Sequence, residues 1–248
     1  MNKWRLFRTG VCGLLVSLII IFLYGYYIPS APVFGKVYYQ SISSDRVVAL
    51  TFDDGPNEPY TSMLLDVLAR YNAKATFFLI GNNVETYPEV ARRILDEEHD
   101  IGNHSYTHNA NHALTFISGT RDVMRAQGAI FEAVGVYPHL YRPPHGKTTP
   151  WQLSDIRQAG MFTVTWNVTT SELGGHSPEI MAQDIINKVR PGCIILLHDG
   201  YGTSIGSVRA DKSATVDAVD LIVRKLLEMD YSFLTVSELL DTSPYLDF

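Results

Sequence analysis

The chain has 248 residues, of which 46% are hydrophobic and 19% are charged, with 18 glycines and 12 prolines. This composition is typical of a globular protein and excludes disordered, collagen-like and coiled-coil chains. The formal net charge at pH 7 is −6. Residues 1–33 carry three basic and no acidic side chains, which leaves 17 basic against 26 acidic residues in the rest. That balance argues against a broad basic face for nucleic acid or anionic lipid, so no nucleic-acid partner is expected.

The first informative segment is an uncharged apolar run, residues 11–28, which follows three basic residues. It has roughly 18 residues, more than the ~7–15 of a signal-peptide core and close to the ~20 that span a membrane. No small-x-small cleavage motif stands out, and Tyr24, Tyr26 and Tyr27 suit an aromatic belt at the far membrane interface. The segment therefore predicts a membrane helix.

We expect an uncleaved signal-anchor with a short linker over residues 1–33, and a cleaved signal peptide is the alternative. A buried core helix is disfavoured because the run has no polar face. The positive-inside rule places the N-terminus in the cytoplasm and residues 34–248 outside the cell. The protein would then be a single-pass cell-membrane protein, or a secreted one if the segment is cleaved.

The remaining residues, 34–248, are expected to form one folded domain, because a chain of this size buries a full core without disulfides or structural zinc. Its two cysteines, Cys12 and Cys193, make no disulfide framework. Apolar β-branched runs alternate with helix-period stretches along this part. Strands are predicted at residues 47–52, 75–80, 139–142, 162–168, 194–198 and 232–236, and helices at 60–71, 88–98, 121–133, 150–158, 178–189 and 214–229.

This β-then-α order predicts a parallel sheet with crossover helices, either closed as a barrel or open and doubly wound. Ligand sites of such folds lie at the carboxyl ends of the strands. Clusters of polar residues should therefore follow the predicted strands directly, and four of them do.

The first cluster is T-F-D-D-G-P, residues 51–56. Neighbouring side chains of a strand point to opposite faces, so Asp53 and Asp54 share a site only if the strand has ended, and Gly55 and Pro56 provide that break. Two carboxylates this close repel each other unless a cation neutralises one. The pair indicates one metal ligand and one base, and a surface turn is the alternative.

The second cluster is G-N-H-S-Y-T-H, residues 102–108. His104 and His108 are spaced i, i+4, which would place both imidazoles on one face of a helical turn as a chelating pair. His112 continues the spacing. An acid of the first cluster is the better third ligand, because sites with two histidines and one carboxylate leave a coordination position for water.

The third and fourth clusters are Y-R-P-P-H-G, residues 141–146, and I-I-L-L-H-D-G, residues 194–200. The paired prolines fix the backbone, which then presents an N–H group at a defined angle, as an oxyanion donor requires. Arg142 needs a partner if it is buried, and Asp53 is the obvious one. The fourth cluster places His198 at the functional edge of the sheet, with Leu196 on the same strand face. A proline-rich loop with a solvated arginine and a structural histidine are the alternatives.

In this order the clusters resemble the carbohydrate esterase family 4 polysaccharide deacetylases, in particular their nodulation-type chitooligosaccharide deacetylase-like domain. The match runs from Val47 to Leu240 and includes the tail D-K-S-A-T-V-D-A-V. The resemblance implies a distorted (β/α) barrel over residues 34–248. It also implies a divalent metal, zinc before cobalt, manganese or nickel, held by Asp54, His104 and His108.

The resemblance further implies hydrolysis of an N-acetyl or O-acetyl group on a glycan. Asp53 would take the proton of the attacking water, and His198 would protonate the leaving group. The catalytic set also includes Arg142 and Glu172. Substrate contacts are expected from Pro144, from His145 through its backbone N–H, and from Leu196, which would line the pocket for the acetyl methyl group.

The chain departs from the family pattern at two places. His145 stands where a tyrosine is usual, and the backbone N–H is unaffected. In residues 165–173, T-W-N-V-T-T-S-E-L, Thr169 and Glu172 stand for two aspartates and Leu173 for a tryptophan. The second acid of the family orients the general-acid histidine and raises its pKa. Glu172 either serves His198 in this way or points to solvent.

These features together predict a metal-dependent polysaccharide deacetylase, a hydrolase of carbon–nitrogen bonds in linear amides. Its expected substrate is an extracellular glycan, N-acetylglucosamine residues of peptidoglycan or of chitin-type oligomers. A glycan-binding wall protein with attenuated catalysis and an O-acetyl esterase of the xylan type are the alternatives. The expected partners are the glycan and the membrane, with no protein partner. Loops such as residues 174–177 and 201–209 are expected to set specificity.

Overall fold

The computed structural model describes residues 3–109, 111–172, 176–202 and 211–246. Leu173 and most of the two predicted specificity loops lie outside these residues. The helices are α1 (Lys3–Tyr27), α2 (Tyr60–Arg70), α3 (Gly81–Thr86), α4 (Pro88–Asp96), α5 (Phe116–Val134), α6 (Pro150–Gln158), α7 (Pro178–Lys188), α8 (Ser213–Glu228) and α9 (Val236–Leu240), with 3₁₀ turns η1 (His112–Leu114) and η2 (Pro144–Gly146). The strands are β1 (Val47–Asp53), β2 (Thr76–Leu79), β3 (Asp100–Asn103), β4 (Leu140–Tyr141), β5 (Phe162–Thr163), β6 (Val168–Thr169), β7 (Ile194–His198) and β8 (Ser232–Leu234).

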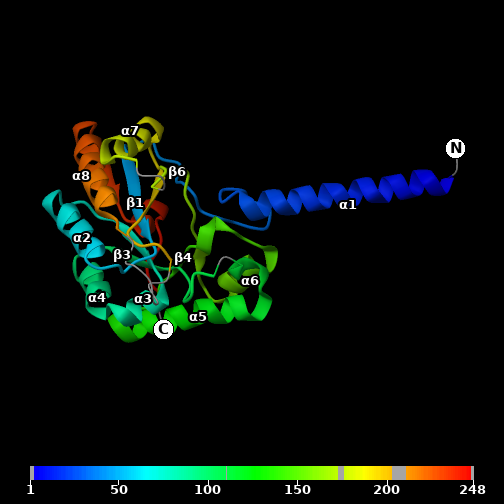
Figure 1. Ribbon diagram of the computed structural model, residues 1–248, viewed down its shortest axis with the longest axis horizontal. Coiled ribbons are helices and arrows are strands. Elements are labelled where there is room, and N and C mark those ends of the chain that lie inside the picture. Colours follow the sequence, from blue (N-terminus) through cyan, green and yellow to red (C-terminus); the bar gives the residue numbers. More distant parts are fainter. Residues whose placement is uncertain (1–2, 110, 173–175, 203–210, 247–248) are drawn as a thin grey trace.

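The strands form one parallel sheet, curled into a half-barrel, with the order β5-β4-β3-β2-β1-β7-β6 and β8 paired with β1. The predicted distorted α/β barrel is confirmed. Figure 1 shows β1 in the middle of the domain, with α2, α7 and α8 packed on one side of it. In the register of β1 and β7, Asp53 lies beside His198. The two acid–base candidates therefore end adjacent strands at the same edge.

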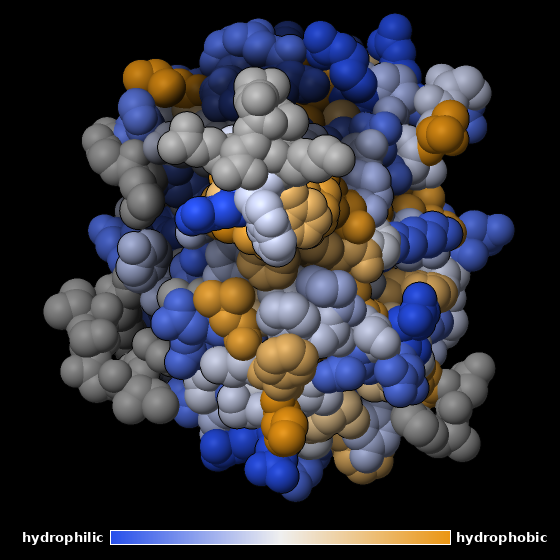
Figure 2. All heavy atoms as spheres, turned by 90° about the vertical axis from the view of Figure 1, so that its right-hand side faces the viewer, coloured by the Kyte–Doolittle hydropathy of each residue, from blue (hydrophilic) through white to orange (hydrophobic). Residues whose placement is uncertain are grey.

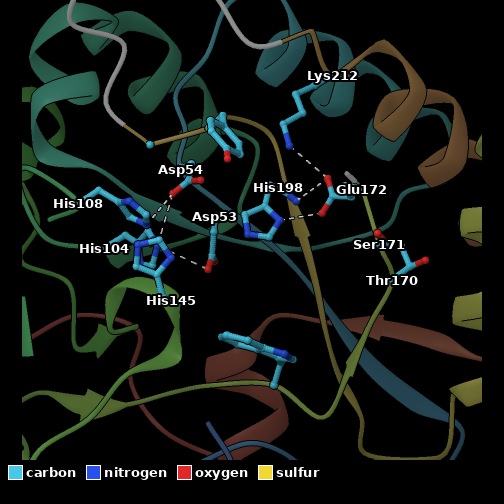
Figure 3. Close-up of a pocket in the computed structure, with 13 residues that line it drawn as sticks. Asp53, Asp54, His104, His108, His145, Thr170, Ser171, Glu172, His198 and Lys212 are labelled. Carbon is cyan, nitrogen blue, oxygen red and sulfur yellow. Dashed lines mark hydrogen bonds and ion pairs between the residues drawn. The ribbon is translucent and has the colours of Figure 1, made fainter. Parts of the chain in front are cut away.

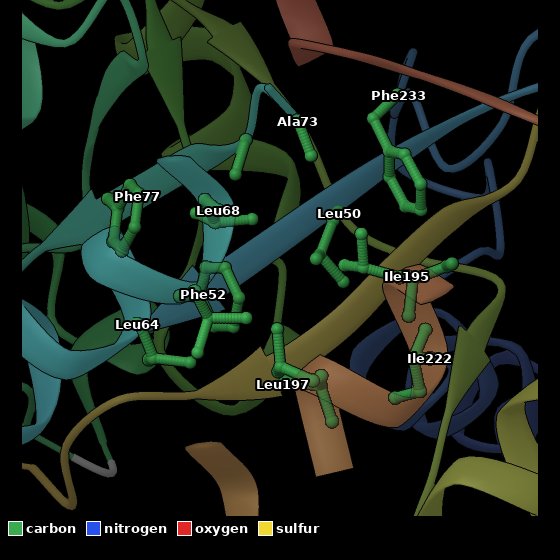
Figure 4. Close-up of a cluster of buried hydrophobic side chains, with 14 of the residues drawn as sticks. Leu50, Phe52, Leu64, Leu68, Ala73, Phe77, Ile195, Leu197, Ile222 and Phe233 are labelled. Atoms are coloured by element: carbon green, nitrogen blue, oxygen red, sulfur yellow. The ribbon is translucent and has the colours of Figure 1, made fainter. Parts of the chain in front are cut away.

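Side-chain alternation along the central strands separates the core from the site. Leu50 and Phe52 of β1 and Ile195 and Leu197 of β7 point outward into the main core, where they meet the helices (Figure 4). Full burial stabilises such side chains by about 1.5–3 kcal/mol each. The intervening residues, which include Thr51 and Asp53 on β1, face the other side of the sheet. The polar side chains are thus gathered on the concave face.

The predicted strand at residues 162–168 is wrong as a single element. It is two short strands, because β5 pairs with β4 at one edge of the sheet and β6 pairs with β7 at the opposite edge. One extended strand cannot pair with both edges, so residues 164–167 cross the opening of the half-barrel between them. The side chain of Trp166 is carried to the mouth of the half-barrel by this crossing.

Three elements were not predicted: β3, α3 and α9. The sequence of β3, D-I-G-N, has little β-branched character, and the strand forms because it pairs with β2. The predicted strand at residues 232–236 ends early because Thr235 and Glu238 form a capping box that begins α9.

Helix α1 projects from the domain (Figure 1). Its stretch Phe7–Tyr27 has a mean hydropathy of 2.1 and is long and apolar enough to cross a membrane, and none of that stretch's most apolar window is buried. Because this segment is exposed, it is not a buried core helix of the domain. A signal sequence near the N-terminus has the same length and composition.

Candidate active site

A cavity of about 390 Å³ opens at the carboxyl ends of the strands (Figure 3). Asp53 and Asp54 reach it from the end of β1, His104 from the end of β3 and His198 from the end of β7. The described residues that line it are Asp53, Asp54, His104, His108, His145, Trp166, Thr170, Ser171, Glu172, His198, Tyr201, Gly202 and Lys212. The structure thus brings residues of all four sequence clusters to one cavity.

Asp54, His104 and His108 form a group whose ligand atoms all lie within 4.8 Å of one another. Asp54 Oδ1 lies 3.3 Å from His108 Nε2 and 3.5 Å from His104 Nε2. The same oxygen is buried and has no hydrogen-bond partner among the described residues. A buried carboxylate oxygen without a donor is costly, and a divalent cation between it and the two imidazoles would satisfy it. The donor set therefore fits a metal.

Neighbouring groups keep His104 neutral and orient its Nε2 as a metal ligand. Its Nδ1 lies 2.8 Å from the carbonyl oxygen of Arg142, so Nδ1–H donates there and Nε2 keeps its lone pair toward Asp54. Burial, together with the adjacent His108, holds the pKa of His104 well below its usual value. His104 is therefore neutral at neutral pH, as a metal ligand must be.

The predicted helical turn that carries the two histidines is wrong. Residues 104–109 form a loop after β3, in which Ser105 (φ 67°) and His108 (φ 52°) adopt left-handed conformations. Asp122 of α5 holds this loop by accepting hydrogen bonds from the N–H groups of Tyr106 and Thr107. The imidazole rings nevertheless converge, with centroids 4.9 Å apart. His112 lies elsewhere, with Nδ1 3.4 Å from an Asp122 oxygen.

Asp53 is fixed by a buried arginine. Nη1 of Arg142 donates to Asp53 Oδ1 at 2.7 Å and to Thr51 Oγ1 at 2.8 Å, and Nη2 donates to the carbonyl oxygen of Thr165 at 3.0 Å. The guanidinium is fully buried and stacks on Phe78, 4.0 Å from the ring centroid. Asp53 Oδ2 faces the metal group, 3.6 Å from His104 Nε2. One oxygen of Asp53 is thus anchored, and the other faces the ligand group.

Glu172 points to His198 and not to solvent. Its Oε1 lies 2.7 Å from His198 Nδ1, and its Oε2 accepts hydrogen bonds from Thr215 Oγ1 at 2.9 Å and Lys212 Nζ at 3.3 Å. Burial lowers the pKa of His198, but the hydrogen bond and charge of Glu172, with Asp54 and Asp53, outweigh burial and raise it to about 9. The pKa of Glu172 is lowered: burial opposes this, and His198, Lys212 and Thr215 overcome it. The extra methylene of glutamate is accommodated by two donors from the start of α8.

The predicted substrate contacts lie at different depths. His145 adopts a left-handed conformation (φ 57°) in η2, and its exposed ring faces the cavity with its centroid 4.7 Å from that of His108. Pro144 and Leu196 are buried, and neither is among the described residues that line the cavity. Leu196 accepts a hydrogen bond at its carbonyl oxygen from Thr169, one of the departures from the family pattern. The roles of Pro144, His145 and Leu196 stay predictions.

Sequence reasoning gave no role to four described residues that line the cavity: Trp166, Thr170, Ser171 and Lys212. Tyr201 and Gly202, which also line it, belong to a loop that was predicted to set specificity. Trp166 supplies an aromatic wall, and its ring lies 5.7 Å from the Arg142 guanidinium carbon. Lys212 belongs to the tail D-K-S-A-T-V-D-A-V, which carried the resemblance but suggested no role. A lysine that is 8% exposed requires a carboxylate partner, and this burial is visible only in the folded chain.

Comparisons with known proteins agree with this geometry. The family model described as "Polysaccharide deacetylase" matches residues 40–164. A peptidoglycan-N-acetylglucosamine deacetylase of Bacillus cereus is 34% identical over 208 residues, which is 83% of this chain and 93% of that protein.

Solved structures give the same result. The Bc1960 peptidoglycan N-acetylglucosamine deacetylase superposes with a TM-score of 0.78 at 31% identity and covers 85% of this chain and 95% of its own. BA3943 of Bacillus anthracis, described as a CE4 family pseudoenzyme, superposes with a TM-score of 0.74 at 27% identity over 83% of this chain and 69% of its own. The chain therefore belongs to the polysaccharide deacetylase family, carbohydrate esterase family 4.

Proposed function

We propose that this protein hydrolyses the N-acetyl group of N-acetylglucosamine residues in peptidoglycan or chitin-type oligomers at the outer cell surface. The observation that carries the proposal is the position of Asp54 Oδ1. It is buried and has no hydrogen-bond partner among the described residues, it faces two imidazoles, and it shares the cavity with a carboxylate held by arginine and a histidine held by glutamate. The B. cereus relative is a peptidoglycan-N-acetylglucosamine deacetylase, which supports N-acetylglucosamine as the acetylated sugar.

Asp54, His104 and His108 would hold the divalent cation. Two imidazole nitrogens and one carboxylate oxygen are a ligand set that zinc favours, so zinc is the proposed ion, with cobalt, manganese and nickel as substitutes. When bound, such a cation lowers the pKa of water and polarises an acyl carbonyl as a Lewis acid. Side chains of the protein would carry out the proton transfers.

Asp53 is the proposed general base. Its Oδ2 accepts the proton of the attacking water, while Oδ1 stays hydrogen-bonded to Arg142. Arg142 therefore fixes the direction in which Asp53 accepts and stabilises its charge in a buried site. The backbone N–H of His145 is proposed to donate to the oxyanion of the tetrahedral intermediate, with Pro144 fixing its angle and Leu196 backing the acetyl methyl group.

His198 is the proposed general acid. A pKa of about 9 keeps it protonated at neutral pH, so it can donate a proton to the sugar nitrogen as the bond from nitrogen to the acyl carbon breaks. The products are acetate and the free amine. Glu172 holds the imidazole by Nδ1, which leaves Nε2 to donate.

The Glu172→Gln variant tests this arrangement through the pH–rate profile. Activity that needs protonated His198 falls as pH rises through the pKa of that histidine. Loss of the Glu172 charge lowers this pKa, so the alkaline limb of kcat should move to lower pH by about 1–3 units. The groups facing His198 are Glu172, Asp53, Asp54 and His145, and only the first changes. Glu172→Asp, which keeps the charge, is the control, and an unmoved limb in Glu172→Gln would show that Glu172 does not support the acid.

Acetate release tests the proposed activity as a whole. The full-length protein in detergent, loaded with zinc, should release acetate from chitin oligomers or from peptidoglycan. Chelation should abolish the release, and added divalent metal should restore it. Acetylated xylan is the comparison substrate that distinguishes N- from O-deacetylation. A metal-loaded protein that is inert on all three substrates would contradict the proposal.

We also propose that α1 anchors the protein, with the domain on the outer side. The length and apolar composition of Phe7–Tyr27 support this, as do the basic residues that precede the run. Under this proposal residues 1–33 form the anchor and its linker, residues 34–248 form the catalytic domain, and the membrane and the glycan are the partners.

A further inference from the structure

The last turn of α1 and the residues directly after it pack against the domain. Tyr26 is 5% exposed, the carbonyl oxygen of Gly25 accepts a hydrogen bond from Thr148 Oγ1 at 3.2 Å, and that of Pro29 accepts one from Thr165 Oγ1 at 3.0 Å. Both threonines are buried. The helix therefore leaves the domain at a fixed angle and is not tethered by a free linker.

The same stretch is needed to cross a bilayer. At 1.5 Å per residue, Phe7–Tyr27 spans about 31 Å, close to the ~30 Å of a hydrocarbon core, whereas residues 7–21 span only about 22 Å. The turns after residue 21 must therefore lie at the outer part of the membrane. Phe22 of this segment contacts the domain, with ring centroids 6.2 Å from Trp151 and 5.3 Å from Phe34. The part of the domain around Trp151 and Phe34 is therefore held at the depth of the outer lipid leaflet.

At this level the domain exposes large apolar side chains. Phe116 and Ile117, at the start of α5, are 61% and 68% exposed, and Leu114 is 44% exposed. The Phe116 ring stacks on Trp151 with centroids 4.4 Å apart, and Trp151 contacts Phe22. The apolar surface thus runs without a break from α1 onto α5. We call Leu114, Phe116, Ile117 and Trp151 the apolar patch.

The chemistry of the patch suits a lipid interface. The indole N–H of Trp151 donates to the carbonyl oxygen of Ala113 at 2.9 Å, so the ring presents apolar surface with its polar atom satisfied. Lys147 lies next to the helix end, with its ammonium 5.5 Å from the Tyr26 ring centroid and 5.8 Å from that of Tyr27, where lipid phosphates would meet it. Figure 2 looks onto the side from which α1 projects, and orange hydrophobic side chains lie around and below the helix.

We propose that the apolar patch is a second membrane contact, which inserts into the interface of the outer leaflet beside α1 and holds the domain against the bilayer. This proposal rests on the anchoring by α1 proposed above. Contiguous exposed apolar surface marks an interaction site, and continuity with a membrane-spanning helix selects lipid as the occupant.

The contact also sets the position of the cavity. A Cβ at Gly146 would lie 2.8 Å from both Pro29 and Trp166, so these three residues pack together, and Trp166 lines the cavity. The cavity rim is thereby joined to the end of the membrane helix. The glycan that reaches it is the part that lies near the membrane surface.

Depth-dependent fluorescence quenching on the full-length protein tests the proposal. The protein is reconstituted into phosphatidylcholine–phosphatidylglycerol vesicles with an NBD probe on one cysteine, in a Cys12→Ala background that retains the buried Cys193. Ile117→Cys reports on the patch and Val16→Cys on α1. Phe131→Cys, a 41% exposed apolar site near the other end of α5, is the matched control.

The expected result is loss of about half of the Ile117 probe emission to lipids spin-labelled near the headgroup, quenching of the Val16 probe by deeply labelled lipids, and neither at Phe131. Quenching at Val16 without quenching at Ile117 would overturn the membrane contact and leave the anchor standing. Probe self-quenching at Ile117 without lipid quenching would show that a second copy covers the patch, and would overturn it too. No quenching at Val16 would overturn the anchor and the contact together.

Discussion

Exchanging Asp53 for asparagine is expected to leave the metal in place and to lower kcat by a factor of about 10²–10⁴. Asparagine retains an oxygen that accepts the Arg142 hydrogen bond, so the geometry of the site is preserved. It cannot accept a proton from water. Acetate release from a chitin oligomer gives kcat, and metal content by mass spectrometry gives occupancy in the same sample.

The same exchange should also lower the free energy of unfolding, because Arg142 is fully buried and loses the charge that pairs with it. Removal of one partner from a buried ion pair costs about 3–5 kcal/mol, and the retained hydrogen bond should keep the loss toward the lower end. Asp217→Asn, on the exposed side of α8, is the control and should change neither quantity. A fully active Asp53→Asn variant would show that another group accepts the proton.

Replacing His104 by alanine is expected to remove metal binding and, with it, acetate release. The variant loses one of three ligand atoms, and even a disturbed outer-shell partner costs about 10–100-fold in metal affinity. Affinity is measured by titration of the apoprotein with zinc. His112→Ala is the matched control, since that histidine is equally buried and has the same sequence spacing but contacts Asp122. Loss of zinc in the His112 variant, with retention in the His104 variant, would reverse the ligand assignment.

The sequence was sufficient to predict the parts of the site whose side chains lie at or directly after the end of a strand. The break that Gly55 and Pro56 provide predicted that the two aspartates share a site, and parallel pairing of β1 with β7 places His198 beside Asp53. The need of a buried arginine for a carboxylate likewise predicted that Arg142 pairs with Asp53, and the structure shows this contact.

The i, i+4 spacing of His104 and His108 was misleading because helical periodicity is only one way to bring two side chains together. Here β3 ends at Asn103, and Asp122 of α5 fixes the loop that follows by accepting hydrogen bonds from the N–H groups of Tyr106 and Thr107. No local pattern in residues 102–108 indicates a partner that far along the chain.

The contacts that hold Glu172 against His198 also could not be predicted from the sequence. Its contacts, His198, Lys212 and Thr215, lie 26, 40 and 43 residues away and depend on how the start of α8 packs against the end of β7. The division of residues 162–168 into β5 and β6 depends in the same way on which edges of the sheet are free. Both features follow from tertiary packing, which overrides local propensity.

X-ray absorption at the zinc edge of the metal-loaded full-length protein tests the central claim most directly. The account predicts one zinc ion per chain, with two imidazole nitrogens and one carboxylate oxygen from the protein. In Asp54→Ala and in His108→Ala it predicts loss of the zinc ion or, where zinc is still bound at high concentration, loss of the corresponding oxygen or nitrogen from its ligand shell. A stoichiometric zinc ion whose ligand shell is the same in the parent protein and in both variants would contradict it.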